Sequence, residues 1–151
     1  VTTTSTASNT LYAIPLNYPT GQVWNRIGVE VTTQTNGSSI RLGIYANNGG
    51  VPGSLVLDAG TVSGATNGLK EITINYTTTN DWFWLACILS NNITLRTINA
   101  ADGTPIFGRT APSDAALRRV QAAQTFGTLP STFPTATAST ANPPFLWVRN
   151  V

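Results

Sequence analysis

Residues 82 to 89 read WFWLACIL, an apolar run in which both alternating sets of side chains are hydrophobic. Successive side chains of a β-strand point to opposite faces of a sheet, so a strand with one wet face alternates apolar and polar residues. A run without polar positions therefore predicts a central strand that is covered on both faces. Cys87 lies inside the run and is the only cysteine of the chain, so we expect a buried, inert thiol and no intrachain disulfide.

The segments around this run have the period of strands with one wet face. Segments with this period occupy residues 26 to 32, 40 to 46, 55 to 59 and 72 to 76, and shorter strand signals occupy 93 to 98 and 145 to 149. Between them lie stretches dense in Asn, Gly, Ser and Thr, which are residues that turns require. Short strands punctuated in this way predict an all-β fold, an antiparallel sandwich or barrel.

One connection between two of these strands is NNGGVPG, residues 47 to 53. Asn-Gly is favoured where both central residues of a turn need positive φ, and Pro52-Gly53 fits a type II turn. The connection is therefore predicted to reverse the chain. It lacks the lysine and the following helix of a phosphate-binding loop, and it lacks the acidic ligands of an EF-hand calcium loop.

A single short helix is expected near residues 114 to 124. Ser113 or Asp114 can cap its start, alanine, leucine and valine supply an apolar stripe, and Gly127 can end it. The segment that follows, residues 127 to 144, holds too many prolines for a sheet ladder and too many apolar side chains for a free linker. We expect it to be a strap laid over the sheet or onto a neighbouring subunit.

The length of 151 residues suits one domain that buries its core without disulfides or a structural metal. Residues 1 to 10 form a Thr/Ser-rich tail without periodicity, which we expect to be an arm that is flexible or ordered by a partner. Residues 11 to 151 then form a single β-sandwich domain that includes the strap.

The charge of the chain and the length of its apolar runs argue against two kinds of partner, nucleic acids and membranes. Charged residues make up only 9% of the sequence, with 8 basic and 6 acidic side chains. The basic side chains are scattered, so no stripe is present that could follow the phosphates of a nucleic acid. The longest apolar run is far shorter than the roughly 20 residues that a membrane helix needs, so no membrane insertion is expected.

The residue types also argue against catalysis. The chain has no histidine, which removes Ser-His-Asp triads, imidazole general bases and nitrogen ligands for metals. The carboxylates are spread over separate segments, so we expect neither a metal site nor a cofactor. Glu30 and Glu71 are the one pair on outward strand positions that a glycosidase could use, but both fit solvent-facing positions opposite core Ile and Val. We therefore expect no catalytic residues and no enzyme.

A series of motifs runs between residues 11 and 98: RIGV, RLGIY followed by NNGGVPG, LVLDAGTV, KEITI and a WLA strand. These motifs, and the ending GTLP…PPFLWVR, resemble a β-sandwich module of tailed-bacteriophage virion proteins, especially the C-terminal parts of minor tail and tail-fibre proteins. The resemblance implies a jelly-roll-like sandwich with a structural or attachment role on the particle surface, usually in oligomers. It carries over no catalytic residues.

The resemblance implies a non-enzymatic protein of the virion, in a tail or tail fibre that contacts the host surface. Because the module fills almost the whole chain, a capsid decoration protein that stabilises the head is the alternative. A carbohydrate-binding module is a second alternative, with Trp24 and Tyr45 as candidates to stack on sugar rings. Core packing would equally explain Trp24, and cross-strand pairing would explain Tyr45. The expected partners are other virion proteins and, for an attachment part, a host-surface glycan.

The protein is also expected to form a homo-oligomer. The apolar side chains of the strap have no strand or helix period, so their burial needs a surface from a neighbouring subunit or from the chain's own sandwich. A weakly charged surface offers little repulsion against association, which favours the neighbour, and the resemblance suggests a trimer. The contact candidates are Phe126, Leu129, Phe133, Pro143 and Pro144.

Overall fold

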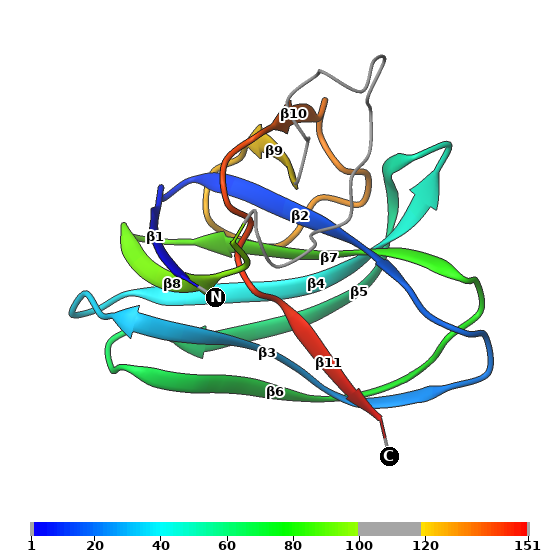
Figure 1. Cartoon of the computed structure of the whole chain (residues 1–151), viewed down its shortest axis with the longest axis horizontal. Coiled ribbons are helices and arrows are strands. Elements are labelled where there is room, and N and C mark those ends of the chain that lie inside the picture. The colour runs from blue at the N-terminus through cyan, green and yellow to red at the C-terminus, as the bar shows by residue number, and fades with distance from the viewer. Residues whose placement is uncertain (1, 100–118, 151) are drawn as a thin grey trace.

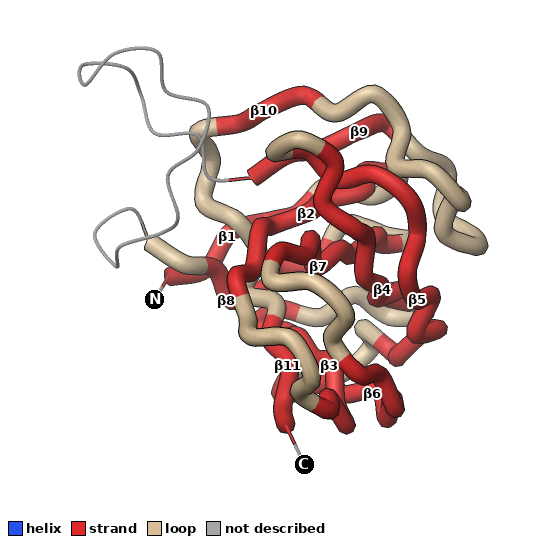
Figure 2. Tube along the Cα trace, turned by 90° about the vertical axis from the view of Figure 1, so that its right-hand side faces the viewer, coloured by secondary structure: helices blue, strands red, loops and turns tan. Residues whose placement is uncertain are grey.

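Two antiparallel β-sheets packed face to face form the protein, in a computed structural model that describes residues 2–99 and 119–150 (Figures 1 and 2). Sheet A contains β1 (Thr2–Thr6), β3 (Val23–Thr33), β6 (Gly68–Thr77), β8 (Ile93–Thr97) and β11 (Trp147–Asn150). Sheet B contains β2 (Thr10–Asn17), β4 (Ser39–Asn48), β5 (Val51–Ser63), β7 (Trp82–Leu89), β9 (Arg119–Ala123) and β10 (Thr137–Ser139). The predicted all-β sandwich is confirmed.

The chain crosses between the two sheets at most of its connections. In sheet A, β6 pairs with one edge of β3, β11 and β8 pair with different parts of the other edge, and β1 follows β8. Sheet B has the order β10-β9-β2-β7-β4-β5, so β7 is an internal strand. Only β4–β5 and β9–β10 are consecutive strands of the same sheet within the described residues, and this alternation gives the fold its jelly-roll-like character.

The two faces of β7 explain why WFWLACIL has no polar position between Phe83 and Leu89. One set of side chains enters the main core between the sheets: Phe83, Leu85, Cys87 and Leu89. The other set lies in a second cluster on the outer face of sheet B: Trp84, Ala86 and Ile88. The strand is therefore covered on both faces, as predicted. Cys87 is fully buried, and this burial raises the pKa of its thiol to about 12.

The strap, residues 127–144, covers the outer face of sheet B, and the surface beneath it belongs to the same chain. Leu129 and Phe133 are only 4% and 6% exposed and complete the second cluster. Leu55 N donates to Ser131 O at 2.8 Å and Phe133 N donates to Gly53 O at 2.9 Å, which attaches the strap to β5. Figure 2 shows the chain leaving β9, running along the side of sheet B that faces away from sheet A, and returning to β10.

The helix expected near residues 114–124 is wrong for its second half, because Arg119–Ala123 is strand β9. β9 pairs with β2 and with β10, and these neighbours supply backbone partners that override the helix-forming composition. Val120 and Ala122 enter the second cluster, whereas the Arg119 guanidinium lies 4.7 Å from the ring centroid of Tyr12 on the other face. Residues 114–118 lie outside the described residues.

Residues 1–10 were expected to be an arm, but Thr2–Thr6 is the edge strand β1. It pairs with β8 over five positions, and Thr6 Oγ1 donates to Ile93 O at 2.8 Å. β-Branched threonine suits a pleated edge strand even without hydrophobic alternation. The segment is therefore held by the chain's own sheet rather than by a partner, and Thr10 already begins β2.

The β4–β5 hairpin confirms that NNGGVPG reverses the chain. Gly49 and Gly50 at its tip have φ values of 61° and 93°, the conformation for which Asn-Gly sequences are favoured. Pro52 and Gly53, by contrast, lie within β5 and Gly53 has no positive φ, so the predicted type II turn is wrong. Figure 1 shows the hairpin projecting beyond the rest of sheet B.

Candidate functional site

The two residues that we expected to stack on sugars are both fully buried. Trp24 lies in the main core, with its ring centroid 5.3 Å from that of Phe83. Tyr45 lies under the strap, where its ring centroid is 5.1 Å from that of Phe133 and its hydroxyl donates to Pro130 O at 3.0 Å. Burial, and then the negative charge of Asp58, raise the pKa of the Tyr45 phenol. Neither ring is available to a ligand, so a glycan site cannot be built on them.

Four of the five residues that we expected at an oligomer contact are buried within the single chain: Leu129, Phe133, Pro143 and Pro144. The fifth, Phe126, is partly buried against the second cluster. Pro144 also forms a bridge with Thr97 at the end of β8. The chain's own sandwich therefore supplies a surface that buries them, which is the second of the two possibilities that the sequence left open. Oligomer formation itself stays a prediction, with its contacts on other residues.

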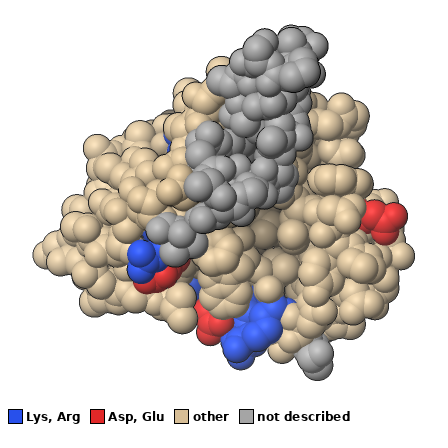
Figure 3. Space-filling model, viewed as in Figure 1, with Lys and Arg blue, Asp and Glu red and all other residues tan. Residues whose placement is uncertain are grey.

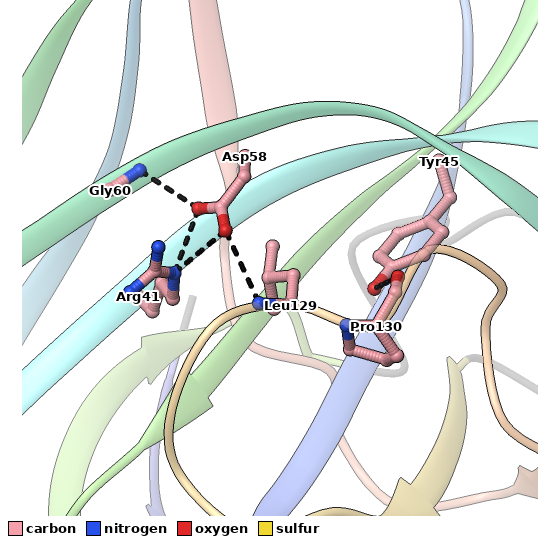
Figure 4. Close-up of polar contacts among 6 residues, drawn as sticks. All are labelled: Arg41, Tyr45, Asp58, Gly60, Leu129 and Pro130. Atoms are coloured by element: carbon pink, nitrogen blue, oxygen red, sulfur yellow. Dashed lines mark hydrogen bonds and ion pairs between the residues drawn. The ribbon is translucent and has the colours of Figure 1, made fainter.

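Asp58 on β5 is the polar anchor of the strap (Figure 4). Arg41 Nε donates to Asp58 Oδ1 at 2.8 Å and to Oδ2 at 2.9 Å, and Gly60 N donates to Oδ1 at 3.1 Å. Leu129 N, from the strap, donates to Oδ2 at 3.2 Å. Burial alone would raise the pKa of Asp58, but the hydrogen bonds from Arg41, Gly60 and Leu129 outweigh it and hold that pKa below its usual value.

This anchor predicts a pH-dependent stability. The pKa of Asp58 is lower in the folded chain than its ordinary value of 3.8, so its stabilisation is complete above that pH and disappears as pH falls through the folded-state pKa. We expect Asp58→Asn to be less stable than wild type near neutral pH and the difference to shrink below pH 3.8. Urea unfolding of both proteins between pH 7 and pH 2 measures this. A difference that stays constant over the whole range would contradict it.

The outer face of sheet A carries two ion pairs, and Figure 3 shows basic and acidic side chains lying next to one another on the molecular surface. Arg96 binds Glu30 through two hydrogen bonds of 3.0 and 2.8 Å, and Arg149 binds Glu71 at 2.8 Å. The hydrogen bond from Arg96 lowers the pKa of Glu30, which is the opposite of what a general acid needs. Among the described carboxylates, Glu30, Asp58 and Glu71 are thus each paired with arginine rather than arranged as a glycosidase pair.

The described residues show neither a metal site nor a helix that could span a bilayer. Among residues 2–99 and 119–150, no three His, Cys, Asp or Glu side chains gather closely enough to hold a metal ion. No helix in the described part of the chain is long and apolar enough to cross a bilayer.

Two shallow depressions lie beside β9. One, of about 440 Å³, is lined by Thr10, Gln121, Ala122, Ala123, Thr135 and Thr137. The other, also of about 440 Å³, is lined by Asn9, Ala123, Gln124 and Thr125. Their linings offer hydroxyl and amide groups without a carboxylate, a cation or a thiol, so they provide hydrogen-bonding surfaces rather than acid–base chemistry.

Trp82 is the exposed aromatic side chain that the sequence did not single out. We expected it to be covered with the rest of WFWLACIL, but it is 49% exposed at the start of β7. Strand alternation does place it on the same face as Trp84, which the strap covers. What the sequence could not indicate is how far the strap extends along that face.

No protein-family model matches this sequence, and no curated protein matches it significantly. The structure alone defines the fold class, which is an antiparallel β-sandwich whose own strap covers the outer face of one sheet. The resemblance to bacteriophage proteins that the sequence motifs suggest therefore stays a prediction.

Proposed function

We propose that the protein is a non-enzymatic structural or attachment module of a bacteriophage particle, exposed on a tail or tail fibre where it contacts the host surface. The observation that carries the proposal is the agreement between motif and fold. The motifs between residues 11 and 98 imply a jelly-roll-like sandwich, and these residues form strands β2 to β8 of such a sandwich.

Results

Sequence analysis

Residues 82 to 89 read WFWLACIL, an apolar run in which both alternating sets of side chains are hydrophobic. Successive side chains of a β-strand point to opposite faces of a sheet, so a strand with one wet face alternates apolar and polar residues. A run without polar positions therefore predicts a central strand that is covered on both faces. Cys87 lies inside the run and is the only cysteine of the chain, so we expect a buried, inert thiol and no intrachain disulfide.

The segments around this run have the period of strands with one wet face. Segments with this period occupy residues 26 to 32, 40 to 46, 55 to 59 and 72 to 76, and shorter strand signals occupy 93 to 98 and 145 to 149. Between them lie stretches dense in Asn, Gly, Ser and Thr, which are residues that turns require. Short strands punctuated in this way predict an all-β fold, an antiparallel sandwich or barrel.

One connection between two of these strands is NNGGVPG, residues 47 to 53. Asn-Gly is favoured where both central residues of a turn need positive φ, and Pro52-Gly53 fits a type II turn. The connection is therefore predicted to reverse the chain. It lacks the lysine and the following helix of a phosphate-binding loop, and it lacks the acidic ligands of an EF-hand calcium loop.

A single short helix is expected near residues 114 to 124. Ser113 or Asp114 can cap its start, alanine, leucine and valine supply an apolar stripe, and Gly127 can end it. The segment that follows, residues 127 to 144, holds too many prolines for a sheet ladder and too many apolar side chains for a free linker. We expect it to be a strap laid over the sheet or onto a neighbouring subunit.

The length of 151 residues suits one domain that buries its core without disulfides or a structural metal. Residues 1 to 10 form a Thr/Ser-rich tail without periodicity, which we expect to be an arm that is flexible or ordered by a partner. Residues 11 to 151 then form a single β-sandwich domain that includes the strap.

The charge of the chain and the length of its apolar runs argue against two kinds of partner, nucleic acids and membranes. Charged residues make up only 9% of the sequence, with 8 basic and 6 acidic side chains. The basic side chains are scattered, so no stripe is present that could follow the phosphates of a nucleic acid. The longest apolar run is far shorter than the roughly 20 residues that a membrane helix needs, so no membrane insertion is expected.

The residue types also argue against catalysis. The chain has no histidine, which removes Ser-His-Asp triads, imidazole general bases and nitrogen ligands for metals. The carboxylates are spread over separate segments, so we expect neither a metal site nor a cofactor. Glu30 and Glu71 are the one pair on outward strand positions that a glycosidase could use, but both fit solvent-facing positions opposite core Ile and Val. We therefore expect no catalytic residues and no enzyme.

A series of motifs runs between residues 11 and 98: RIGV, RLGIY followed by NNGGVPG, LVLDAGTV, KEITI and a WLA strand. These motifs, and the ending GTLP…PPFLWVR, resemble a β-sandwich module of tailed-bacteriophage virion proteins, especially the C-terminal parts of minor tail and tail-fibre proteins. The resemblance implies a jelly-roll-like sandwich with a structural or attachment role on the particle surface, usually in oligomers. It carries over no catalytic residues.

The resemblance further implies a non-enzymatic protein of the virion, in a tail or tail fibre that contacts the host surface. Because the module fills almost the whole chain, a capsid decoration protein that stabilises the head is the alternative. A carbohydrate-binding module is a second alternative, with Trp24 and Tyr45 as candidates to stack on sugar rings. Core packing would equally explain Trp24, and cross-strand pairing would explain Tyr45. The expected partners are other virion proteins and, for an attachment part, a host-surface glycan.

The protein is also expected to form a homo-oligomer. The apolar side chains of the strap have no strand or helix period, so their burial needs a surface from a neighbouring subunit or from the chain's own sandwich. A weakly charged surface offers little repulsion against association, which favours the neighbour, and the resemblance suggests a trimer. The contact candidates are Phe126, Leu129, Phe133, Pro143 and Pro144.

Overall fold

Two antiparallel β-sheets packed face to face form the protein, in a computed structural model that describes residues 2–99 and 119–150 (Figures 1 and 2). Sheet A contains β1 (Thr2–Thr6), β3 (Val23–Thr33), β6 (Gly68–Thr77), β8 (Ile93–Thr97) and β11 (Trp147–Asn150). Sheet B contains β2 (Thr10–Asn17), β4 (Ser39–Asn48), β5 (Val51–Ser63), β7 (Trp82–Leu89), β9 (Arg119–Ala123) and β10 (Thr137–Ser139). The predicted all-β sandwich is confirmed.

The chain crosses between the two sheets at most of its connections. In sheet A, β6 pairs with one edge of β3, β11 and β8 pair with different parts of the other edge, and β1 follows β8. Sheet B has the order β10-β9-β2-β7-β4-β5, so β7 is an internal strand. Within the described residues, only β4–β5 and β9–β10 are consecutive strands of the same sheet, and this alternation gives the fold its jelly-roll-like character.

The two faces of β7 explain why WFWLACIL contains no polar residue. One set of side chains enters the main core between the sheets: Phe83, Leu85, Cys87 and Leu89. The other set lies in a second cluster on the outer face of sheet B: Trp84, Ala86 and Ile88. The strand is therefore covered on both faces over most of its length, as predicted. Cys87 is fully buried, and this burial raises the pKa of its thiol to about 12.

The strap, residues 127–144, covers the outer face of sheet B, and the surface beneath it belongs to the same chain. Leu129 and Phe133 are only 4% and 6% exposed and complete the second cluster. Leu55 N donates to Ser131 O at 2.8 Å and Phe133 N donates to Gly53 O at 2.9 Å, which attaches the strap to β5. Figure 2 shows the chain leaving β9, running along the side of sheet B that faces away from sheet A, and returning to β10.

The helix expected near residues 114–124 is wrong for its second half, because Arg119–Ala123 is strand β9. β9 pairs with β2 and with β10, and these neighbours supply backbone partners that override the helix-forming composition. Val120 and Ala122 enter the second cluster, whereas the Arg119 guanidinium lies 4.7 Å from the ring centroid of Tyr12 in the main core. Residues 114–118 lie outside the described residues.

Residues 1–10 were expected to be an arm, but Thr2–Thr6 is strand β1. It pairs with β8 over five positions, and Thr6 Oγ1 donates to Ile93 O at 2.8 Å. β-Branched threonine suits a pleated strand even without hydrophobic alternation. The segment is therefore held by the chain's own sheet rather than by a partner, and Thr10 already begins β2.

The β4–β5 hairpin confirms that NNGGVPG reverses the chain. Gly49 and Gly50 at its tip have φ values of 61° and 93°, the conformation for which Asn-Gly sequences are favoured. Pro52 and Gly53, by contrast, lie within β5 and Gly53 has no positive φ, so the predicted type II turn is wrong. Figure 1 shows the hairpin projecting beyond the rest of sheet B.

Candidate functional site

The two residues that we expected to stack on sugars are both fully buried. Trp24 lies in the main core, with its ring centroid 5.3 Å from that of Phe83. Tyr45 lies under the strap, where its ring centroid is 5.1 Å from that of Phe133 and its hydroxyl donates to Pro130 O at 3.0 Å. Burial raises the pKa of the Tyr45 phenol. Neither ring is available to a ligand, so a glycan site cannot be built on them.

Four of the five residues that we expected at an oligomer contact are buried within the single chain: Leu129, Phe133, Pro143 and Pro144. The fifth, Phe126, is partly buried against the second cluster. Pro144 also forms a bridge with Thr97 at the end of β8. The chain's own sandwich therefore supplies a surface that buries them, which is the second of the two possibilities that the sequence left open. Oligomer formation itself stays a prediction, with its contacts on other residues.

Asp58 on β5 is the polar anchor of the strap (Figure 4). Arg41 Nε donates to Asp58 Oδ1 at 2.8 Å and to Oδ2 at 2.9 Å, and Gly60 N donates to Oδ1 at 3.1 Å. Leu129 N, from the strap, donates to Oδ2 at 3.2 Å. Burial alone would raise the pKa of Asp58, but the hydrogen bonds from Arg41, Gly60 and Leu129 outweigh it and hold that pKa below its usual value.

This anchor predicts a pH-dependent stability. The pKa of Asp58 in the folded chain is below its ordinary value of 3.8, so its stabilisation is complete above that pH and disappears as pH falls through the folded-state pKa. We expect Asp58→Asn to be less stable than wild type near neutral pH, and the difference to shrink below pH 3.8. Urea unfolding of both proteins from neutral to strongly acidic pH measures this difference. A difference that stays constant over the whole range would contradict the prediction.

The outer face of sheet A carries two ion pairs, and Figure 3 shows basic and acidic side chains lying next to one another on the molecular surface. Arg96 binds Glu30 through two hydrogen bonds of 3.0 and 2.8 Å, and Arg149 binds Glu71 at 2.8 Å. The hydrogen bond from Arg96 lowers the pKa of Glu30, which is the opposite of what a general acid needs. Glu30 and Glu71 are thus each paired with an arginine rather than arranged as a glycosidase pair.

The described residues show neither a metal site nor a helix that could span a bilayer. Among residues 2–99 and 119–150, no three His, Cys, Asp or Glu side chains gather closely enough to hold a metal ion. In the same part of the chain, no helix is long and apolar enough to cross a membrane.

Two shallow depressions lie beside β9. One, of about 440 Å³, is lined by Thr10, Gln121, Ala122, Ala123, Thr135 and Thr137. The other, also of about 440 Å³, is lined by Asn9, Ala123, Gln124 and Thr125. These lining residues offer hydroxyl and amide groups, so they provide hydrogen-bonding surfaces rather than acid–base chemistry.

Trp82 is an exposed aromatic residue that the sequence did not single out. We expected it to be covered with the rest of WFWLACIL, but it is 49% exposed at the start of β7. Strand alternation does place it on the same face as Trp84, which lies in the second cluster. What the sequence could not indicate is how far the strap extends along that face.

No protein-family model matches this sequence, and no curated protein matches it significantly. The structure alone defines the fold class, which is an antiparallel β-sandwich whose own strap covers the outer face of one sheet. The resemblance to bacteriophage proteins that the sequence motifs suggest therefore stays a prediction.

Proposed function

We propose that the protein is a non-enzymatic structural or attachment module of a bacteriophage particle, exposed on a tail or tail fibre where it contacts the host surface. The observation that carries the proposal is the agreement between motif and fold. The motifs between residues 11 and 98 imply a jelly-roll-like sandwich, and these residues form strands β2 to β8 of such a sandwich.

The chemistry of the described surface supports a binding rather than a catalytic role. Glu30, Asp58 and Glu71 are held by arginines, and the thiol of Cys87 is buried in the main core. The remaining surface is rich in Thr, Ser and Asn and weakly charged, with a net charge of +2 for the chain. Such a surface suits many weak, neutral contacts, and multivalent display on a particle would add these contacts together.

The proposed partners are other virion proteins and further copies of the chain, with a trimer as the proposed oligomer. The apolar anchors of the strap, Leu129 and Phe133, are already buried on sheet B, which favours a contact through other side chains. The oligomer contact would therefore use surfaces that the strap leaves open, such as the outer face of sheet A, where Leu69 is 67% exposed.

Analysis of purified particles tests the proposed function. Particles produced with this protein are banded in a density gradient, and the copy number of the chain is measured by quantitative mass spectrometry against the major capsid protein. An abundant host protein followed through the same gradient controls for contamination. We expect the chain to band with the particles at a copy number far below that of the capsid protein. A copy number close to it would indicate the capsid decoration role, and absence from the particles would refute both roles.

A further inference from the structure

We propose that Trp82, together with Asn17 and Asn47 beside it, forms a binding site for a neutral saccharide ring. This inference goes beyond the proposed role in a virion and does not depend on it, because sugar binding can be measured on the isolated chain. It replaces the buried Trp24 and Tyr45 with an aromatic residue that a ligand can reach.

Three adjacent strands of sheet B place the three side chains in one row. Asn17 on β2 pairs directly with Trp82 on β7. Ala46 on β4 pairs with Phe83, so the next position of the same register places Asn47 on the other side of Trp82. Neighbouring strands lie about 4.8 Å apart, so the indole stands between two carboxamides on its two sides. Figure 1 shows these ends of β2, β7 and β4 close to the β4–β5 hairpin.

The row lies on the outer face of sheet B, just beyond the strap. Trp82 is two residues from Trp84, so both side chains point to this face. Trp84 is 2% exposed, whereas Trp82 is 49% exposed. Asn47 faces the same way, because its Oδ1 accepts a hydrogen bond from Trp84 Nε1 at 3.0 Å. One indole is therefore covered within the second cluster, whereas the next one is open to solvent.

Hydrogen bonds within the chain orient both asparagines. Asn47 Oδ1 also accepts from Gly50 N at 3.2 Å, so both bonds engage its oxygen and leave the Nδ2 group to donate to a ligand. Asn17 Nδ2 donates to Asp81 O at 2.9 Å, which leaves Asn17 Oδ1 to accept. The row thus offers a hydrogen-bond donor on one side of the indole and an acceptor on the other.

A pyranose ring matches this arrangement. Its C–H face is apolar and can pack on the indole, and its hydroxyl groups both donate and accept hydrogen bonds at the ring edge. Asp81, whose backbone oxygen accepts the hydrogen bond from Asn17 Nδ2, also brings a negative charge to this end of sheet B. This charge would repel sialic and uronic acids, so the site favours neutral sugars.

Binding is tested on the full chain with an array of neutral and acidic glycans, followed by NMR titration of the four tryptophan indole N–H signals with the bound neutral glycans. Methyl glucoside, methyl galactoside and N-acetylglucosamine oligomers serve as defined probes. We expect the Trp82 signal to shift most, while that of Trp24, which is buried in the main core, stays nearly fixed. Trp82→Ala should weaken binding about tenfold or more, and Asn17→Ala should weaken it less.

The matched control is Phe145→Ala, which removes another exposed aromatic side chain, beside Arg96 of β8 in sheet A, and should leave the affinity unchanged. An unfolding curve close to that of wild type for each variant shows that a loss of binding is not caused by a loss of folding. The proposal is overturned if no neutral glycan binds, if Trp82→Ala binds as well as wild type, or if only acidic glycans bind. Binding of a protein but of no glycan would assign the row to a protein contact and would also overturn it.

Discussion

Truncating Phe133 to alanine is expected to lower the free energy of unfolding by about 3–5 kcal/mol, as for other buried phenylalanines. Phe133 is 6% exposed, and its ring packs edge-on against Tyr45 with centroids 5.1 Å apart. Its removal leaves a cavity between the strap and sheet B, which the strap can close only by losing the hydrogen bond from Phe133 N to Gly53 O. Urea unfolding of the monomeric protein measures the effect.

Phe126→Ala is the matched control for this variant, because Phe126 is a phenylalanine that directly precedes the strap and is only partly buried. We expect a clearly smaller loss of stability for it. If Phe133→Ala left the unfolding curve unchanged and instead dissociated an oligomer, the strap would pack on a neighbouring subunit rather than on sheet B.

Replacing Gly43 by alanine is the second large effect that we expect, a loss of about 1–3 kcal/mol from overpacking. A Cβ atom at this position would meet Leu129 Cδ1 of the strap and would lie 2.8 Å from Leu57 O. The leucine could move, but the carbonyl belongs to the paired strand β5 and cannot move without disturbing the sheet. Glycine at this position thus lets the strap approach the backbone of β4.

Gly127→Ala provides the control within the strap itself. Gly127 has no positive φ, and a Cβ atom there would have no neighbour within 4 Å. Alanine should therefore be neutral or stabilise the protein by up to about 1 kcal/mol through the unfolded state. In addition, Leu129→Ala should recover only part of the Gly43→Ala loss in a double-mutant cycle, since the contact with Leu57 O remains. Equal stability of the two glycine variants would show that the strap does not lie on β4.

The alternation of apolar and polar residues predicted the sandwich, because it indicates which side chains of a strand face a core. WFWLACIL indicated a strand covered on both faces, and β7 is buried by sheet A on one side and by the strap on the other. The Asn-Gly signal of the β4–β5 hairpin was equally readable, since positive φ at Gly49 and Gly50 is a local requirement of the backbone.

The wrong predictions concern segments whose local structure depends on distant parts of the chain. Arg119–Ala123 has helix-forming residues, but the free edge of β2 makes it a strand. Thr2–Thr6 has no hydrophobic alternation, yet β8 offers it backbone partners. No local pattern of these segments contains that information, because the pairing strand lies far away in the sequence.

The candidate sites were predictable only in part for the same reason. The sequence allowed either a packing role or a sugar-binding role for Tyr45 and Trp24. Tyr45 is buried in the second cluster and Trp24 in the main core, so both have packing roles. The row of Asn17, Trp82 and Asn47 could not be read from the sequence, because its members come from three strands whose register is set by the whole sheet.

Site-resolved hydrogen exchange of the amides between the strap and β5 is the most direct test of the central claim, that the chain covers its own sheet B. Leu129 N and Phe133 N of the strap donate to β5, and Leu55 N of β5 donates to Ser131 O of the strap. We predict that these amides exchange slowly, and equally slowly at every protein concentration down to that of the monomer. Fast exchange in the monomer, with protection appearing only as the protein associates, would contradict the account.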